Sequence, residues 1–272
     1  MPELPEVETI ARGLELLITD STIGKIEIRY PGIIAGEQDY FKKNLTGKKV
    51  IRVWRRAKLL IFDLSGSSHL VFHLKMTGKV WIPGREILPD KHTHVVFGLD
   101  DGRTIFFQDT RKFGYCALFS SKELVSWNFY AGLGPEPLEL STEEFACLFK
   151  SKKSRIKALL LDQKIIAGIG NIYADESLFM AGIHPETPGS SLTDQELLIL
   201  HQSLKDVLIR AIEAGGSSFR NYRNALGYSG MFQENFLVYG KKGECCTKCG
   251  TLIETCKVAG RTSCVCPSCQ KI

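Results

Sequence analysis

The 272-residue sequence predicts an α+β protein: an antiparallel β-sandwich or barrel comes first, a helical domain second and a small metal-binding ribbon last. Three observations indicate this order. Short alternating or apolar runs fill residues 24 to 120, helical periodicity replaces them beyond residue 134, and seven of the nine cysteines lie in the last 28 residues. A chain of this length can bury a sizeable core and commonly holds more than one domain.

An amphipathic helix is expected almost at the start of the chain. Apolar residues recur at helical spacing from Val7 to Ile18. Pro5 suits the first turn of a helix, and the carboxylates of Glu6 and Glu8 are favoured at a helix N-terminus.

The strand region follows this helix. Turn signals, SGSS at 65–68 and DDG at 100–102, separate its short runs, as in antiparallel sheets. The runs are KIEIRY, KVIRVW, LLIFDL, HLVFHL, HVVFGL and TIFF. Gly-Pro-Glu-Pro at 134–137 interrupts the pattern, so we place the first domain at residues 1–133.

The second domain, residues 134–234, is predicted to be helical. Ser141 with Glu144 and Thr193 with Glu196 form capping-box patterns, and the second pattern opens a helix that runs to the glycines at 215 and 216. Residues 217–231 are rich in Ser, Asn and Gly, which is typical of a disordered connection or a functional lid.

The last segment, residues 235–272, carries the most specific spacing. Two Cys-x2-Cys pairs, Cys246 with Cys249 and Cys266 with Cys269, are separated by sixteen residues, as in four-thiolate zinc ribbons. Reduced buried thiols would explain scattered cysteines but not two such pairs. We therefore expect one structural Zn²⁺, without which so short a segment cannot hold a core. Cys245, next to the first pair, leaves the identity of the ligands open, and Cys256 and Cys264 have no assigned role.

Basic residues gather in three regions although the net charge is only +5. Residues 41–58 hold eight Lys/Arg and no acid, residues 150–157 read KSKKSRIK, and residues 235–272 hold six Lys/Arg against two Glu. Any one cluster is explained by a solvated face, but three of them beside a zinc ribbon favour a polyanionic partner. The sequence contains no run of 18 apolar residues and no signal-like N-terminus, so we expect no membrane contact and a cytoplasmic protein.

Eight motifs in order along the whole chain resemble the bacterial formamidopyrimidine-DNA glycosylases. They are PELPEVET at 2–9, RRAKLL at 55–60, HLKMTG at 73–78, KHTH at 91–94, DTRKFG at 109–114, LGPEPL at 133–138, IKALLLDQKIIAGIGNIYADESLF at 156–179, and the ribbon ending GRTSCVCPSCQ. The resemblance implies an N-terminal β-sandwich, a helix–two-turn–helix module and a zinc ribbon. It also implies excision of oxidised purines from double-stranded DNA, chiefly 8-oxoguanine opposite cytosine, followed by cleavage of the abasic strand.

The resemblance also implies catalytic residues. Pro2, exposed as the terminal amine once Met1 is trimmed, would attack the sugar and form an iminium, which acts as an electron sink for elimination. Glu3 would shuttle protons with support from Glu6, and Lys58 would assist β-elimination. Arg261 matches an arginine assigned to δ-elimination, but an arginine hardly deprotonates, so a phosphate clamp is the better expectation.

DNA contacts are carried over in the same way. Met76, Arg111 and Phe113 would fill the space left by the everted lesion, read the orphan cytosine and wedge the stack. His92, Lys152 and Asn171 would bind phosphates, the last from a glycine-flanked helix start. In the 217–231 loop, Ser217, Ser218 and Tyr222 could present donors to the base.

Two other functions stay open at this point. One is an enzyme of the same scaffold that prefers oxidised pyrimidines, as endonuclease VIII-like proteins do; the other is a zinc-dependent nucleic-acid-binding protein without chemistry. The presence of Pro2, Glu3 and Lys58 disfavours the second. No interface pattern is visible, so a monomer is the default.

Overall fold

The computed structural model describes residues 2–218 and 222–271, which form two compact units. The first unit contains the chain up to Ala131 together with Ile212–Met231, and the second contains Gly132–Ala211 and the chain from Phe232 onwards. The first division between the units lies between Ala131 and Gly132. The segment 217–231 belongs with the β-rich unit, and the ribbon belongs with the helices.

The first unit is built on two four-stranded antiparallel sheets, as the alternating runs predicted. One sheet has the order β1 (Ile23–Ile28), β6 (Thr93–Leu99), β7 (Thr104–Asp109) and β5 (Gly78–Trp81). The other has the order β2 (Val50–Arg56), β3 (Leu59–Leu64), β4 (Ser68–His73) and β8 (Tyr115–Ser120). The six predicted runs each correspond to a strand, whereas β5 and β8 lie outside them.

Aromatic side chains join the two sheets into a sandwich. Phe72 of β4 meets Phe97 and Phe107 of the opposite sheet edge-on, with ring centroids 5.9 and 5.3 Å apart. All three rings are fully buried. Because strand side chains alternate between faces, the apolar positions of both sheets converge on this core.

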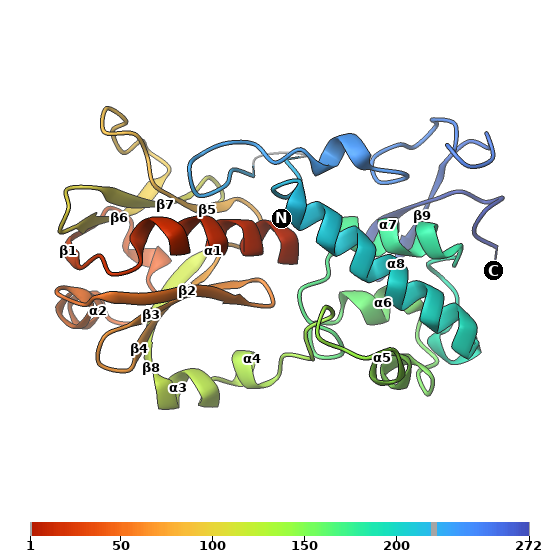
Figure 1. The fold of residues 1–272 in the computed structure, drawn as a ribbon, viewed down its shortest axis with the longest axis horizontal. Helices are drawn as coiled ribbons and strands as arrows, with labels where there is room; N and C mark the ends of the chain where they lie inside the picture. Colours follow the sequence, from red (N-terminus) through yellow and green to blue (C-terminus); the bar gives the residue numbers. More distant parts are fainter. Residues whose placement is uncertain (1, 219–221, 272) are drawn as a thin grey trace. The chain divides into compact units, whose positions relative to one another are not determined.

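Helix α1 (Leu4–Ile18) lies along the sandwich beside β2 and β5, as Figure 1 shows in red. Its apolar stripe is buried and Pro5 occupies its first turn, both as predicted. An ion pair of 2.7 Å between Glu8 and Arg55 of β2 fixes the helix against the sheet. Short helices flank the rest of the sandwich: α2 (Gln38–Leu45), α3 (Ser121–Ser126), α4 (Asn128–Ala131) and the 3-10 turn Pro31–Ile33.

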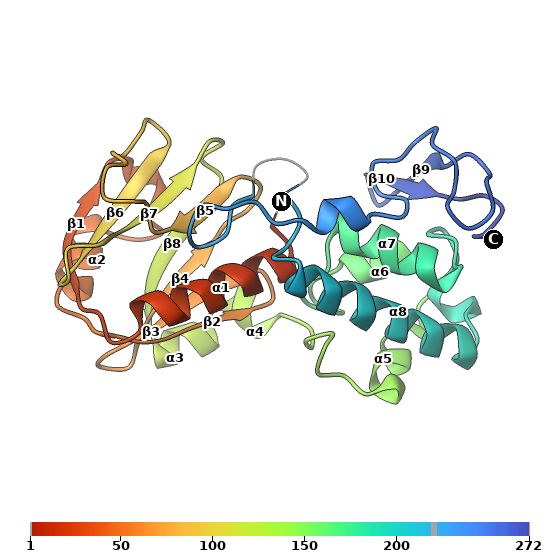
Figure 2. The ribbon, with the colours of Figure 1, turned by 45° about the horizontal axis from the view of Figure 1, so that its top comes forward.

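The second unit contains the helices α5 (Thr142–Phe149), α6 (Ile156–Leu161) and α7 (Asn171–Ala181), and most of α8 (Asp194–Glu213). Both predicted capping boxes are confirmed, at Ser141 with Glu144 and at Thr193 with Glu196. The ribbon hairpin of β9 (Glu254–Val258) and β10 (Arg261–Val265) packs beside α7 (Figure 2). Two 3-10 turns, Gly189–Ser191 and Phe232–Asn235, complete the unit. Within the described residues, no helix combines the length and the apolar character needed to cross a bilayer.

Candidate functional site

The start of α1 brings Pro2, Glu3 and Glu6 together. All three residues are buried, and Glu3 is the N-cap of the helix, in a capping box whose partner is Glu6. Glu6 also extends beyond the helix, since its Oε2 accepts from the Glu3 backbone N–H at 2.8 Å while its Oε1 accepts from the Ser217 N–H at 2.8 Å. One carboxylate thus links the N-terminal residues to a segment more than 200 positions away.

The segment after α8 packs tightly on α1. Gly216 takes a φ of +82°, and a Cβ there would lie 3.2 Å from the Glu6 side chain, so only glycine fits without strain. The Tyr222 hydroxyl donates to the Glu6 carbonyl oxygen at 3.3 Å, and its ring joins the sandwich core beside Ala225. Burial, together with the charge of Glu6, raises the pKa of Tyr222, so this hydroxyl stays protonated.

The three predicted donors of the 217–231 loop therefore lie in different surroundings. Tyr222 is a core residue, and Ser218 donates from its hydroxyl to the Tyr222 carbonyl while accepting from the Gly230 N–H. The buried Ser217 hydroxyl has no hydrogen-bond partner within the described part of the chain. Residues 219–221 of this loop lie outside the described residues.

Lys58 lies in the tight turn between β2 and β3 and is only 9% exposed. The preceding Ala57 has a φ of +53°, a left-handed conformation that costs a residue with a Cβ about 1 kcal/mol. His73 ends the neighbouring strand, where it pairs with Leu59. Burial lowers the pKa of His73 to about 3, with contributions from Lys75 and Lys58, so the imidazole is neutral. This histidine is the first residue of the HLKMTG motif, and no role for it follows from the sequence.

Met76, Arg111 and Phe113 are brought together from two loops. The Arg111 guanidinium lies 4.7 Å from the centre of the Phe113 ring, and its Nη1 is 2.9 Å from the Met76 sulfur. Phe113 is 54% exposed, which is unusual for so large an apolar side chain. An exposed aromatic ring, a thioether and a guanidinium in contact form a surface suited to insertion between stacked bases.

A buried carboxylate that the sequence interpretation missed organises this cluster. Asp109, fully buried, accepts from the backbone N–H groups of Arg111, Phe113 and Gly114 at 3.1, 2.8 and 2.6 Å. Its Oδ1 also accepts from the hydroxyl of Thr77, next to Met76. Hydrogen bonds therefore hold both loops to this one side chain. In the sequence, only the place of Asp109 in the DTRKFG motif marks it as a candidate.

Replacing this carboxylate by an amide is expected to loosen the cluster. In Asp109→Asn the new amino group would face at least one N–H donor, and each buried donor without an acceptor costs about 1–3 kcal/mol. We expect the free energy of unfolding in urea to fall by about 2 kcal/mol or more. Asp39→Asn, on the exposed side of α2, is the control. Equal unfolding midpoints for the two variants would contradict this role.

In the second unit, Asn171 opens α7 and reaches the ribbon. Its Nδ2 donates to the carbonyl oxygen of Thr262 at 3.0 Å, directly after the exposed Arg261. A side-chain amide has a second N–H donor besides the one that bonds Thr262. The Asn171 amide and the helix N-terminus thus lie close to the backbone beside Arg261, and a positive helix end next to a basic residue favours an oxyanion.

A buried ion pair supports this arrangement. Lys157 of α6 lies 2.6 Å from Asp175 of α7, and both side chains are almost fully buried. The Lys157 ammonium also donates to the Ser263 hydroxyl at 2.7 Å, and Asp175 accepts from the Cys264 N–H at 3.0 Å. Burial raises the pKa of Asp175 to about 6 despite the neighbouring Lys157. The pair connects both helices to β10, and spacing along the chain could not reveal it.

The remaining predicted phosphate ligands, His92 and Lys152, are both half-buried. His92 is half-buried in the loop before β6, where its N–H donates to Asp90 and its carbonyl accepts from the Asp109 N–H. Lys152 is half-buried in the turn after α5, with its backbone bonded to Phe149 and Ser190.

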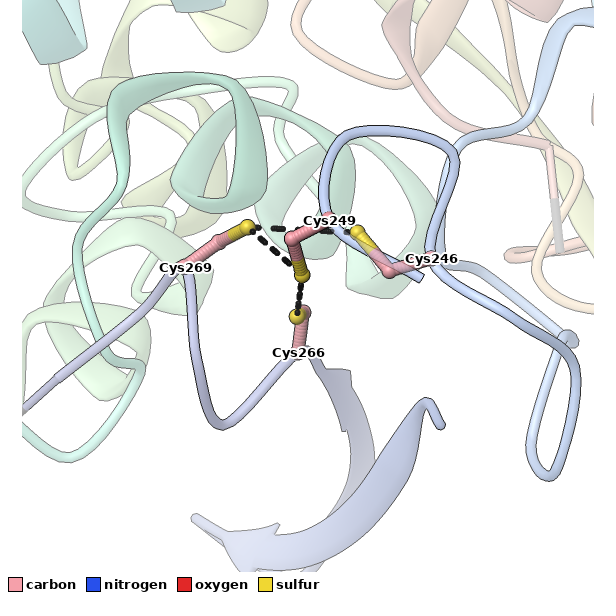
Figure 3. Close-up of side chains that lie close together, drawn as sticks. All are labelled: Cys246, Cys249, Cys266 and Cys269. Carbon is pink, nitrogen blue, oxygen red and sulfur yellow. Dashed lines mark hydrogen bonds between the residues drawn. The ribbon is translucent and has the colours of Figure 1, made fainter. Parts of the chain in front are cut away.

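The four predicted cysteines converge at one end of the ribbon (Figure 3). Cys249 Sγ lies 3.4 Å from the sulfurs of both Cys266 and Cys269, and Cys246 Sγ lies 3.9 Å from that of Cys269. Cys245 is exposed and lies outside this cluster. Four thiols at these separations form a metal site of the four-cysteine type.

Known proteins are similar to this chain over its whole length. Residues 1–116 match the family model described as the formamidopyrimidine-DNA glycosylase N-terminal domain, and residues 133–223 match that of its H2TH domain. The chain is 44% identical over 275 residues to the formamidopyrimidine-DNA glycosylase of Brevibacillus brevis, covering 100% of this chain and 99% of that protein.

Solved structures agree with these matches. The chain is similar to a Lactococcus lactis FPG mutant in complex with Fapy-dG-containing DNA, with a TM-score of 0.93, 38% identity and full coverage of both chains. It is also similar to MutM in complex with DNA containing carbocyclic 8-oxo-G, with a TM-score of 0.92, 38% identity and full coverage of both chains.

Proposed function

This chain belongs to the formamidopyrimidine-DNA glycosylase family, whose DNA glycosylase and abasic-site lyase activity acts on oxidised purines, and we propose that Pro2 is its nucleophile. The observation that carries the proposal is the buried cluster at the start of α1, where Pro2 adjoins two buried carboxylates. Three such residues at a chain terminus are unusual, because termini commonly carry exposed and mobile residues.

The chemistry requires a free amine at Pro2. Removal of Met1, which lies outside the described residues, converts an acylated nitrogen into a secondary amine. Its lone pair forms a bond to the anomeric carbon of the sugar, the bond to the damaged base breaks, and the base leaves with a proton. Protonation of the sugar ring oxygen then breaks its bond to the anomeric carbon, and the Pro2 lone pair forms the iminium at that carbon. The iminium accepts the electron pair of the C2′–H bond when that proton is removed, and the enamine so formed returns a pair that expels the 3′ phosphate.

Neighbouring groups take the remaining roles in this proposal. Glu3 transfers the protons, and Glu6 holds the Glu3 backbone and the Ser217 segment in place. Lys58, next to the neutral His73, assists elimination and holds a phosphate. Arg261 binds a phosphate beside Asn171 rather than moving a proton, since a guanidinium stays protonated.

The partner in this proposal is double-stranded DNA that contains an oxidised purine. Met76, Arg111 and Phe113 would occupy the opened base stack, while His92, Lys152 and Asn171 would bind phosphates. Of the loop residues, Ser217 is supported as a donor to the base by its unpartnered hydroxyl, whereas Ser218 and Tyr222 would keep the loop in shape. We propose a monomeric enzyme that acts on the chromosome in the bacterial cytoplasm.

We also propose that the four-cysteine cluster holds one structural Zn²⁺. Four sulfurs at a Zn–S distance of about 2.3 Å form a tetrahedron whose edges are about 3.8 Å. The separations of 3.4–3.9 Å between neighbouring sulfurs fit such an ion. A metal here would link the two turns that carry the cysteines and would take no part in the chemistry.

Trapping with borohydride tests the nucleophile and the function together. Reduction of the iminium should link the trimmed, zinc-loaded protein covalently to a duplex with 8-oxoguanine opposite cytosine, with Pro2 as the linked residue in peptide mass analysis. An undamaged duplex should give no adduct. Failure to trap any adduct would favour the binding protein without chemistry.

Substitution of Pro2 by glycine should show how much the rate depends on the orientation of the terminal amine. In Pro2→Gly the terminal amine remains but loses the ring that restricts it, and a misplacement of about 1 Å can cost about 100-fold in rate. We expect single-turnover excision of 8-oxoguanine to fall at least that far. Pro31→Gly, at an exposed turn of the same unit, should leave the rate unchanged. Excision by Pro2→Gly within threefold of the wild type would contradict a nucleophilic Pro2.

Oxidised pyrimidines are a second candidate substrate class. The structure of Lactococcus lactis FPG in complex with oxidised-pyrimidine-containing DNA, 38% identical to this chain, supports keeping it. Side-by-side cleavage of duplexes that carry 8-oxoguanine or a pyrimidine glycol ranks the two. Faster cleavage of the pyrimidine lesion would overturn the purine assignment.

A further inference from the structure

His184, Glu186 and Cys256 form a second cluster of metal-ligating side chains in the helical unit. One ligand atom from each lies within 4.8 Å of the other two. His184 and Glu186 belong to the turn that follows α7, and Cys256 lies in the middle of β9. From this juxtaposition we propose that the three residues bind one divalent transition-metal ion, separate from the four-cysteine site.

The chemistry of the donors narrows the choice of ion. An imidazole, a carboxylate and a thiolate offer nitrogen, oxygen and sulfur, a set that suits Zn²⁺ or Co²⁺ and disfavours Mg²⁺ and Ca²⁺, which select oxygen. Binding releases the thiol proton to solvent, and the two anionic ligands then balance the charge of the ion. Three protein ligands leave one tetrahedral position for water.

The surroundings permit such an ion. His184 is 9% exposed, and its Nδ1 accepts from the Glu186 N–H at a long distance of 3.3 Å. The Glu186 carboxylate is paired with Arg155 through Oε1 at 3.1 Å, an ion pair that leaves Oε2 to face a metal. Ligand atoms around one Zn²⁺ are about 3.3–3.6 Å apart, so small rotations of the half-buried Glu186 and Cys256 would close the site.

The site would tie the ribbon to the helices. Arg155 already bridges the same two segments, since it contacts both Glu186 and, at 3.4 Å, the Lys257 carbonyl. The Gln270 side chain donates to the carbonyl of Ile183, the residue before His184, at 2.9 Å. A metal between His184, Glu186 and Cys256 would strengthen a connection on which the position of Arg261, in the paired strand β10, depends.

Titration of the full-length, metal-free protein with Co²⁺ tests the proposal. We expect two equivalents to bind with thiolate-to-cobalt absorption, the first from the four-cysteine site and a weaker second. Cys256→Ser should bind only the first equivalent, and Glu186→Gln should weaken the second at least tenfold. Cys147→Ser, which removes an exposed thiol of α5, should retain both.

The outcome is decided by the second equivalent. Binding of the first equivalent by each variant shows that the ribbon has folded, so a lost second equivalent reports on the new site. A wild-type protein that saturates at one equivalent, or a Cys256→Ser protein that still binds two with unchanged affinity, would overturn the proposal. Neither result bears on the four-cysteine site or on the glycosylase activity.

Discussion

Glu3→Gln should excise 8-oxoguanine about 10²–10⁴-fold more slowly than the wild type, the usual contribution of a positioned acid or base. The amide cannot give or take the proton that the leaving base and the opening sugar require. It can still accept the Glu6 N–H, which is the structural role of Glu3 in the capping box of α1. The substitution therefore removes the proposed chemistry and keeps the helix cap.

The measurement is single-turnover excision, compared with thermal unfolding of the same preparations. Glu3→Ala removes both the acid and the cap, and it should lose about 1 kcal/mol of stability in addition. If Glu3→Gln excises within a few-fold of the wild type while Glu3→Ala is unstable, Glu3 is a helix cap and the assignment of proton transfer fails.

Local patterns predicted most elements of both units. Local sequence patterns a few residues long specify six of the eight sandwich strands, the helix behind Pro5 and the two capping boxes. A single sequence is therefore enough to predict them. The cysteine pairs are equally local, since each pair lies on one turn. The four-residue strand β5 is too short to show a period.

Long-range partners explain what could not be predicted. The Asp109 carboxylate accepts a hydrogen bond from Thr77, 32 residues away, and the Glu6 carboxylate accepts one from Ser217, 211 residues away. Neither partner can be identified from residues nearby in the sequence. Tyr222 looked like part of a polar loop, yet its ring fills the sandwich core because Gly216 lets the chain turn close to α1. Whether a polar segment is buried depends on the surface against which it packs. Residues from the whole chain form that surface, so the neighbours of the segment in the sequence do not reveal its burial.

The same distinction applies to the candidate site. The resemblance indicated Pro2, Glu3 and Lys58 by position, but their environment comes from the fold. A neutral His73 beside Lys58 and a buried Glu6 that holds two separate backbones are consequences of packing. Such supporting groups orient the reacting atoms, and enzymes lose rate when that support is loosened.

The thiolates of the ribbon should be indispensable for its folding. Its small core consists of Phe179, Val238, Cys246, Ile253, Cys264 and Cys266, so half of the buried residues are cysteines and two of these are proposed ligands. Apolar burial of this size cannot offset the ordering of some forty residues. A structural Zn²⁺ contributes about 10–16 kcal/mol of apparent binding energy to such folds.

Cys249→Ser should therefore unfold the ribbon and release Arg261 from its place beside Asn171. Loss of charge-assisted phosphate contacts worth about 1.5–3 kcal/mol should raise the Kd for a lesion-bearing duplex about tenfold to 150-fold. Prolonged treatment with a chelator should do the same to the wild type. Cys245→Ser, which alters an exposed thiol close by in the chain but outside the cluster, is the matched control. If both serine variants bind zinc and DNA alike, Cys249 is not a ligand and the four-cysteine site is wrongly assigned.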